Sequence, residues 1–189
     1  MENRNSDNPT LDNAILEMQN YNINGHIHNY AVWTAARAVQ RRFQGATTKS
    51  ISNAINDAGL KAKFLDSDIK WTDDKFEKIH EEAIEILKSN LANCTYGRAA
   101  KIIAIYIKTA IVLPSKGENS LSKVAFPPID NILLSNLKDK DIIESKPIWT
   151  QIKDSDAFFI IITQIKTFLK HEPLWKIECF WQSYKKIKK

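Results

Sequence analysis

Residues 96–113, YGRAAKIIAIYIKTAIVL, decide the fold class of this chain. From Ala99 onward the segment is apolar on nearly every side, and only Lys101 and Lys108 bring charge into it. A helix that is hydrophobic all round lies buried in the core of a domain. The run is shorter than the roughly 20 apolar residues that span a bilayer, and its lysines oppose insertion. We therefore expect a helix over residues 95–113 at the centre of the fold.

Amphipathic helices are expected on both sides of this central helix, because apolar residues recur there at helical spacing. The expected helices cover residues 11–21, 28–43, 48–58, 73–91, 127–137, 154–170 and 173–184, with a polar loop over 115–124. The expected N-caps are Thr47 or Thr48, Thr72 and Thr95. The predicted fold class is all-α: a single compact domain of seven to nine helices around the helix at 95–113.

The expected helix at 28–43 has an apolar face and a basic edge. The residues that follow the helical spacing, and are expected to face the core, are Tyr30, Trp33, Ala36, Val39 and Phe43. Arg37, Arg41 and Arg42 extend from the same helix. These arginines form a basic corner that would contact either DNA or the acidic helix segment at 73–85, and the second contact is preferred because it lies within the chain.

Length and composition fit one globular domain, since the 189 residues are 43% hydrophobic and 26% charged. We expect a frayed N-terminus over residues 1–10 and a single helical domain over 11–189. This domain divides into an acidic-leaning half, 11–96, and a basic half, 97–189. Residues 1–96 carry 11 basic and 13 acidic side chains, and the remaining residues carry 16 and 9. The resulting net charge of +7 makes the second half the expected contact for a polyanion.

Several functional classes lack the motifs that they need. The sequence has no Gly-x-Ser-x-Gly, P-loop, dinucleotide fingerprint or His-Glu-x-x-His. Residues 1–13 have no basic region followed by an apolar one, as a secretory signal would. We expect a cytoplasmic protein with no cofactor, no metal and no membrane partner, in which Cys94 and Cys179 are free thiols.

The four histidines are interpreted as structural. His26 and His28 are spaced like half a metal site, but they lack carboxylate or thiol companions at ligand spacing. His171 follows a helix end, where a cation is favourable. His80 is expected on the exposed or boundary side of the helix at 73–91.

Lys101 and Lys108 lie seven residues apart, and so on one face of the central helix. Burial disfavours the charged form of a lysine, and a pKa lowered toward neutrality makes the amine a nucleophile that can form a Schiff base. The alternative is that both lysines pack their methylenes on the core and extend their ammonium groups to water.

The segment FPPID, residues 126–130, is expected to place Asp130 in the first turn of a helix. The helix N-terminus stabilises a carboxylate at that position, which suits electrostatic stabilisation of a developing positive charge. The alternative is an ordinary first-turn aspartate with no functional role.

The segment KIIAIYIK, residues 101–108, followed by a loop and PPID, residues 127–130, resembles the active-site region of helix-hairpin-helix DNA glycosylases. The lysine and the aspartate are separated by 29 residues, a spacing most similar to that of the archaeal 8-oxoguanine DNA glycosylase branch. The resemblance covers about residues 96–137. It departs from the family at the hairpin, where Gly97 stands without the second glycine of the usual turn.

This resemblance implies a helix-hairpin-helix glycosylase-like fold and a role for individual residues. Lys101 would attack C1′ of the sugar and hold it as a Schiff base, and Asp130 would orient or stabilise the oxocarbenium-like centre. Thr95, Gly97 and Arg98, where the central helix begins, would contact DNA phosphate through backbone amides and a guanidinium.

The C-terminal segment is the second candidate DNA contact, because it interleaves aromatic residues with lysines that could stack an unpaired base and neutralise phosphates. The candidate base-stacking residues are Trp175 and Trp33, and the candidate DNA-binding lysines are Lys108, Lys176, Lys185 and Lys186. The same segment would equally suit a lipid headgroup layer. Alternatively, its aromatic residues are core or dimer contacts and its lysines form a solvated tail.

These features predict a DNA-binding protein whose partner is duplex DNA with a flipped base. Its expected activity is that of a base-excision glycosylase and lyase, acting in DNA repair on a modified or damaged base. The alternative is a non-enzymatic helical interaction module that binds a protein partner or DNA. The enzyme hypothesis requires the Lys101 amine and the Asp130 carboxylate to meet at one concave, basic cleft.

Overall fold

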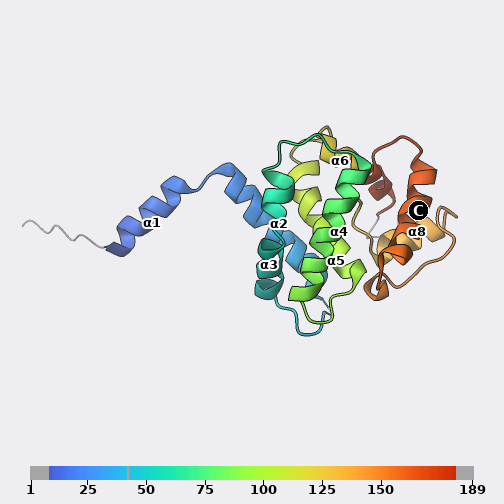
Figure 1. Ribbon diagram of the computed structural model, residues 1–189, viewed down its shortest axis with the longest axis horizontal. Coiled ribbons are helices and arrows are strands. Elements are labelled where there is room, and N and C mark those ends of the chain that lie inside the picture. Colours follow the sequence, from blue (N-terminus) through green and yellow to red (C-terminus); the bar gives the residue numbers. More distant parts are fainter. Residues whose placement is uncertain (1–8, 42, 182–189) are drawn as a thin grey trace, which may run out of the picture.

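A computed structural model describes residues 9–41 and 43–181, and Figure 1 shows them as a bundle of helices. The α-helices are α1 (Pro9–Asn20), α2 (Ile23–Gln40), α3 (Thr48–Asp57), α4 (Asp73–Asn90), α5 (Tyr96–Ile107), α6 (Ser120–Val124), α7 (Asn131–Lys138) and α8 (Ser155–Leu169). Two π-helical turns, η1 (Lys61–Leu65) and η2 (Lys108–Val112), and two 3₁₀ helices, η3 (Trp149–Gln151) and η4 (Leu174–Phe180), complete the set. Neither described range contains a β-strand, so the all-α prediction is confirmed.

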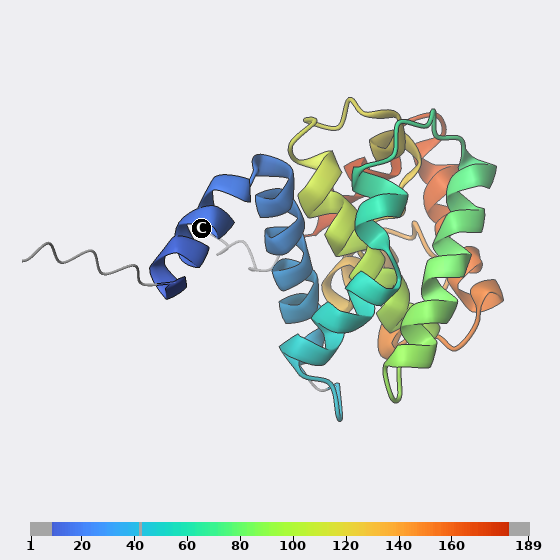
Figure 2. The same ribbon diagram turned by 60° about the vertical axis from the view of Figure 1, so that its left-hand side comes forward.

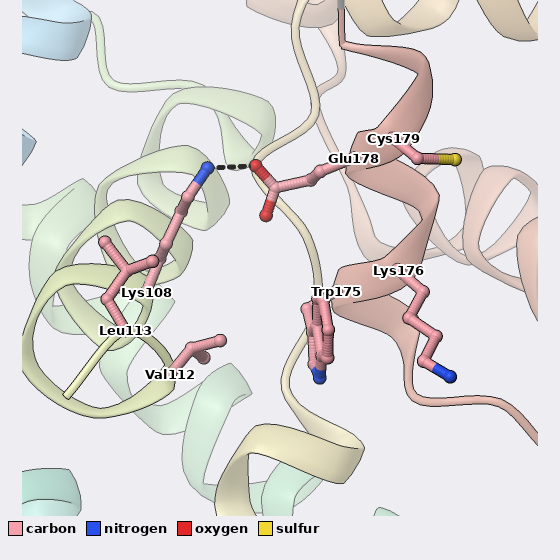
Figure 3. A pocket seen from close by; sticks show the side chains of 7 residues that line it. All are labelled: Lys108, Val112, Leu113, Trp175, Lys176, Glu178 and Cys179. Carbon is pink, nitrogen blue, oxygen red and sulfur yellow. Dashed lines mark hydrogen bonds and ion pairs between the residues drawn. The ribbon is translucent and has the colours of Figure 1, made fainter. Parts of the chain in front are cut away.

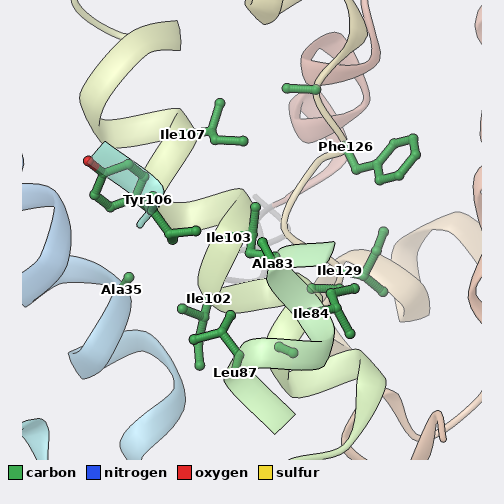
Figure 4. Packing of buried hydrophobic residues seen from close by; sticks show 14 of the residues in the cluster. Ala35, Ala83, Ile84, Leu87, Ile102, Ile103, Tyr106, Ile107, Phe126 and Ile129 are labelled. Atoms are coloured by element: carbon green, nitrogen blue, oxygen red, sulfur yellow. The ribbon is translucent and has the colours of Figure 1, made fainter. Parts of the chain in front are cut away.

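Helix α5 and its continuation η2 form the centre of the domain, as predicted for residues 95–113. Ile102, Ile103 and Tyr106 are fully buried, and α5 packs most extensively on α2 and α4. Figure 4 shows Ile102 between Ala35 of α2 and Leu87 of α4. Each fully buried aliphatic side chain of this kind stabilises the fold by about 1.5–3 kcal/mol.

The predicted threonine N-caps are present. Thr47 and Ser50 form a capping box at the start of α3, and the Thr72 side chain accepts the amide of Lys75 where α4 begins. The Thr95 hydroxyl accepts the amide of Arg98 and so fixes the start of α5. These caps depend only on residues within one turn, which is why the sequence predicts them correctly.

Helix α2 begins earlier than expected. The expected helix covers 28–43, but α2 begins at Ile23, and Asn24 and Gly25 lie in its first turn. The Asn22 side chain accepts the Gly25 amide at 2.9 Å and caps the helix there. The break between α1 and α2 is therefore confined to Tyr21 and Asn22.

The inner face of α2 is also different from the predicted one. Tyr30 and Trp33 were expected to face the core, but they are 56% and 52% exposed and stack on each other, with ring centres 5.8 Å apart. The buried face consists of Ala31, Val32, Ala35, Ala36 and Val39. Small side chains let α2 approach α5 closely, so the large rings turn outward.

His80 lies in the core, so the expectation of an exposed or boundary position is wrong. Its side chain is 1% exposed, and its ring packs against Phe76, Phe126 and Phe158 at centroid distances of 5.0–6.0 Å. Neither ring nitrogen has a hydrogen-bond partner in the structure. Burial lowers the pKa of His80 from 6.5 to about 3, so the ring is neutral at pH 7.

Three predicted boundaries change. The expected loop at 115–124 contains α6, and the last expected helix at 173–184 is the 3₁₀ helix η4. Residues 182–189, which include Lys185 and Lys186, lie outside the described residues. At the other end residues 1–8 are likewise outside them, and α1 begins at Pro9, within the segment expected to be frayed.

Helix α1 points away from the rest of the chain in both Figure 1 and Figure 2. Every residue from Thr10 to Asn24 is exposed. Of the helices that the structure describes, none has the length and apolar character needed to cross a membrane.

Candidate functional site

The fold brings Lys101 and Asp130 together. The Lys101 Nζ atom, on the second turn of α5, lies 3.3 Å from Oδ2 of Asp130. Lys101 is buried, with 8% of the residue exposed, and the Asp130 side chain is 14% exposed. The sequence predicted this pair across 29 residues, and the structure places the amine and the carboxylate in direct contact.

Asp130 is the N-cap of α7 and not a residue of its first turn. Its Oδ1 atom accepts the amides of Ile132 and Leu133 at 3.0 and 2.9 Å. Its Oδ2 atom contacts Lys101 and accepts the indole N–H of Trp181 at 3.0 Å. Both oxygens are thus held by the protein, and the carboxylate points toward the lysine from a fixed helix end.

Two cavities meet at the Lys101–Asp130 pair. One has a volume of about 620 Å³, and its lining includes Arg41, Arg98 and Trp149. The other, of about 300 Å³, includes Lys108, Glu178 and Trp181. Lys101 and Asp130 line both cavities, so the ion pair lies where the two cavities meet.

Trp149 is a site residue that sequence reasoning missed. The Lys101 Nζ atom lies 4.5 Å from the centre of its ring, within the range of a cation–π contact. Trp149 belongs to η3, in a stretch without helical periodicity. The sequence therefore offered no signal that places Trp149 beside α5.

Lys108 faces a carboxylate that the sequence did not single out. It forms an ion pair with Glu178 of η4. Burial is the largest influence on Glu178 and raises the pKa of its carboxyl group above the usual value, although Lys108 opposes this shift. Lys108, predicted to contact DNA, is therefore already paired within the chain, and Lys176 is paired with Glu172.

Trp175 lines a third, apolar cavity of about 490 Å³ rather than the two beside Lys101. Figure 3 shows Trp175 across this cavity from Val112, with the Lys108–Glu178 pair at one end. Its indole packs against Gly117, where a Cβ atom would lie 2.8 Å from the ring. Trp33, the other predicted base-stacking residue, is on the outer face of α2 and stacks on Tyr30. Neither Trp175 nor Trp33 is among the described residues that line the two cavities beside Lys101.

The start of α5 is covered by the chain itself. The Gly97 amide, predicted to bind phosphate, donates to the Ile152 carbonyl at 3.1 Å, and the Thr95 hydroxyl donates to the Thr150 carbonyl at 3.0 Å. Arg98 lies with its guanidinium 4.6 Å from the Phe43 ring centre and also lines the larger cavity. Of the three predicted phosphate contacts, Arg98 is the one at the cavity.

No family model, curated protein or solved structure matches this chain. The resemblance to helix-hairpin-helix DNA glycosylases stays a prediction. Among the residues that the structure describes, no group of three or more His, Cys, Asp or Glu side chains is arranged to hold a metal ion. The chemistry available at the site is that of a buried amine, a fixed carboxylate, an aromatic ring and two arginines.

Proposed function

We propose that this chain is a DNA-binding protein that excises a modified or damaged base, using Lys101 as the nucleophile of a glycosylase and lyase reaction. The observation that carries the proposal is the 3.3 Å contact between the Lys101 amine and the Asp130 carboxylate at the edge of an open, basic cavity. Amine nucleophiles of this kind form covalent intermediates that divide one difficult step into two.

The proposed reaction begins when the Lys101 ammonium loses a proton, for which the nearest acceptor is the Asp130 carboxylate. The nitrogen lone pair then forms a bond to C1′ of the sugar as the bond between C1′ and the base breaks. The base leaves with the electron pair of the broken bond and takes up the proton that Asp130 accepted. The secondary ammonium then loses a proton, the nitrogen lone pair forms the C1′=N bond as the C1′–O4′ bond of the sugar ring breaks, and O4′ takes up that proton. The product is the protonated Schiff base.

The cavity supports this proposal by its size and its lining. A volume of about 620 Å³ falls within the roughly 300–1,000 Å³ typical of small-molecule sites and accommodates a flipped nucleoside. Trp149 offers an aromatic face for the base beside the amine. The cationic side chains of Arg41 and Arg98 at the same cavity suit the phosphates on either side of the flipped nucleotide.

The test is borohydride trapping of the purified chain on duplexes that carry a panel of damaged or modified bases. We expect a covalent adduct with at least one of them, its loss in Lys101→Gln, and a rate lowered by roughly a hundredfold or more in Asp130→Asn. Lys88→Gln is the matched control, because Lys88 lies on α4 and pairs with Glu85. It should form the adduct at the wild-type rate.

The outcomes separate the enzyme from the alternative helical module. Binding to duplex DNA with no adduct on any duplex, and unchanged binding by Lys101→Gln, would replace the enzyme by a non-enzymatic DNA-binding protein. Absence of both binding and trapping would reject the DNA proposal altogether.

A further inference from the structure

Helix α1 and the outer face of α2 carry most of the large hydrophobic side chains that are exposed among the described residues. Of the thirteen large hydrophobic side chains that are exposed among the described residues, eight lie between residues 11 and 33. These eight are Leu11, Ile15, Leu16, Met18, Tyr21, Ile23, Tyr30 and Trp33. We call this set the arm surface. Exposed apolar patches of this extent mark interaction sites in folded proteins.

Helix α1, which we call the arm, is held away from the rest of the domain by the turn that connects it to α2. Asn22 caps α2, and the Tyr21 hydroxyl contacts Nδ1 of His26 at 3.2 Å and accepts from the Asn29 side chain at 3.4 Å. Only Tyr21 and Asn22 separate the two helices. A link this short, tied down at both residues, sets the direction of α1 away from α2 and keeps it from folding back.

A 12-residue helix in this position needs a partner. Isolated helices shorter than about 12–15 residues are marginal in water, and most helical stability in proteins comes from packing of an apolar face. Every residue of α1 from Leu11 to Asn20 is exposed, so none of the described residues of the chain covers its apolar face. A second chain could provide that cover.

Charge decides which kind of partner fits. The segment from Pro9 to Asn20 carries Asp12 and Glu17 and no basic residue. An acidic arm is repelled by DNA and by an anionic membrane surface, which binds basic amphipathic helices. The outer face of α2 carries Tyr30 and Trp33 and, one turn further, the exposed Arg37. This face offers both the apolar contacts and the positive charge that α1 requires.

We propose that two copies of this chain form a dimer by exchanging arms, with α1 of each copy packed antiparallel on the outer face of α2 of the other. Helix α1 is about 18 Å long and the stripe from Ile23 to Trp33 about 15 Å, so the lengths correspond. The antiparallel direction places Asp12 of one copy toward the end of the stripe that is nearest to Arg37 of the other. Both contacts arise twice by two-fold symmetry.

The area available is sufficient for a stable dimer. Covering eight side chains at roughly 100 Å² each removes on the order of 800 Å² per copy, which is what one partner contributes to a standard interface. The aromatic pair Tyr30 and Trp33 lies within this surface. Large aromatic side chains are the residues that contribute most binding energy in such interfaces.

The test is sedimentation velocity of the full chain between about 1 and 200 μM. We expect a species of twice the 21.7 kDa chain mass, and a monomer at all these concentrations for the double variant Ile15→Asp, Met18→Asp. Both side chains are exposed on α1, so circular dichroism should show a folded domain. Ile160→Asp is the matched control: Ile160 is 60% exposed on α8, and this variant should remain dimeric.

A charge exchange tests the antiparallel pairing. Asp12→Arg and Arg37→Asp should each raise the dimer dissociation constant by about tenfold, and the two changes in one chain should restore it. A monomeric wild-type chain, including one that floats with neutral phosphatidylcholine vesicles, would overturn the proposal. So would a dimer that persists in the α1 double variant, or an absence of rescue in the charge exchange.

Discussion

His80 shows how one residue can make stability depend on pH. Its ring is enclosed by phenylalanines and has no hydrogen-bond partner, so burial lowers its pKa to about 3. The unfolded chain binds a proton at this histidine below pH 6.5, whereas the folded chain does so only near pH 3. The folded state is therefore progressively disfavoured as the pH falls through this window.

We predict that the free energy of unfolding falls by up to about 1.4 kcal/mol per pH unit below pH 6.5 because of His80. His80→Leu should remove its share of the slope between about pH 6.5 and 5, above the range in which most carboxylates titrate. The share of His28, whose pKa burial also lowers, should remain. Urea unfolding at several pH values measures the effect. His171→Leu, at an exposed position, should leave the wild-type slope in place, and an equal slope in His80→Leu would contradict the prediction.

The positions of residues were predicted correctly where residue chemistry and sequence spacing pointed to the same place. They were predicted wrongly where tertiary packing determines which face of a helix is buried. Lys101 and Asp130 were paired through the resemblance of their two segments to the glycosylase active-site region, and local caps at Thr95 and Asp130 set where α5 and α7 begin. Tyr30 and Trp33 fit an apolar stripe equally well, but the neighbouring alanines form the closer contact with α5. Periodicity does not tell which of two overlapping stripes faces inward.

At the scale of the element, Asp130 has a structural role that must be separated from the proposed catalytic one. It caps α7 through Oδ1 and contacts Lys101 through Oδ2. Asparagine retains the capping oxygen, whereas alanine does not. Alanine therefore removes the helix cap as well as the ion pair with Lys101, whereas asparagine removes the ion pair and keeps the cap.

We predict that Asp130→Ala lowers the free energy of unfolding by about 1 kcal/mol more than Asp130→Asn does, because alanine loses the cap. In a Lys101→Met background, from which the ion pair is gone, both variants still lose the Oδ2 acceptor of the Trp181 indole N–H. Asp130→Ala should therefore still cost about 1 kcal/mol more than Asp130→Asn, which keeps the cap. Denaturant titration of the four variants gives these differences. Equal losses for alanine and asparagine in the Lys101→Met background would show that the cap does not stabilise α7.

Helices whose starts are marked by a capping residue were predicted correctly, whereas segments whose geometry depends on tertiary contacts were not. Thr47, Thr72 and Thr95 mark helix starts within one turn of sequence. The short helix α6 packs on η2 and η4, and η4 packs on α6, α7 and α8, so the geometry of both depends on tertiary contacts. A stretch without periodicity, such as the one that contains Trp149, acquires its place only when the domain closes around α5.

At the scale of the whole molecule, the candidate site depends on how tightly α5 meets the segment from Trp149 to Ile152. The Gly97 amide donates to Ile152, and a Cβ atom at Gly97 would lie 2.0 Å from the Trp149 carbonyl oxygen. This close approach holds Trp149 where its ring meets the Lys101 amine. One glycine in the central helix therefore couples the packing of the domain to the shape of the larger cavity.

We predict that Gly97→Ala destabilises the chain by about 1–3 kcal/mol, because the backbone at Trp149 must move to admit the methyl group. Within an isolated helix the same change would stabilise by up to about 1 kcal/mol, so the sign distinguishes packing from propensity. Gly25→Ala is the matched control: Gly25 lies in the first turn of α2, and its nearest neighbour to an added Cβ is 3.7 Å away. Urea unfolding should show Gly25→Ala as stable as the wild type or more stable. A stabilised Gly97→Ala chain would mean that the segment from Trp149 to Ile152 is not held against α5, and that the ring of Trp149 has no fixed place beside the Lys101 amine.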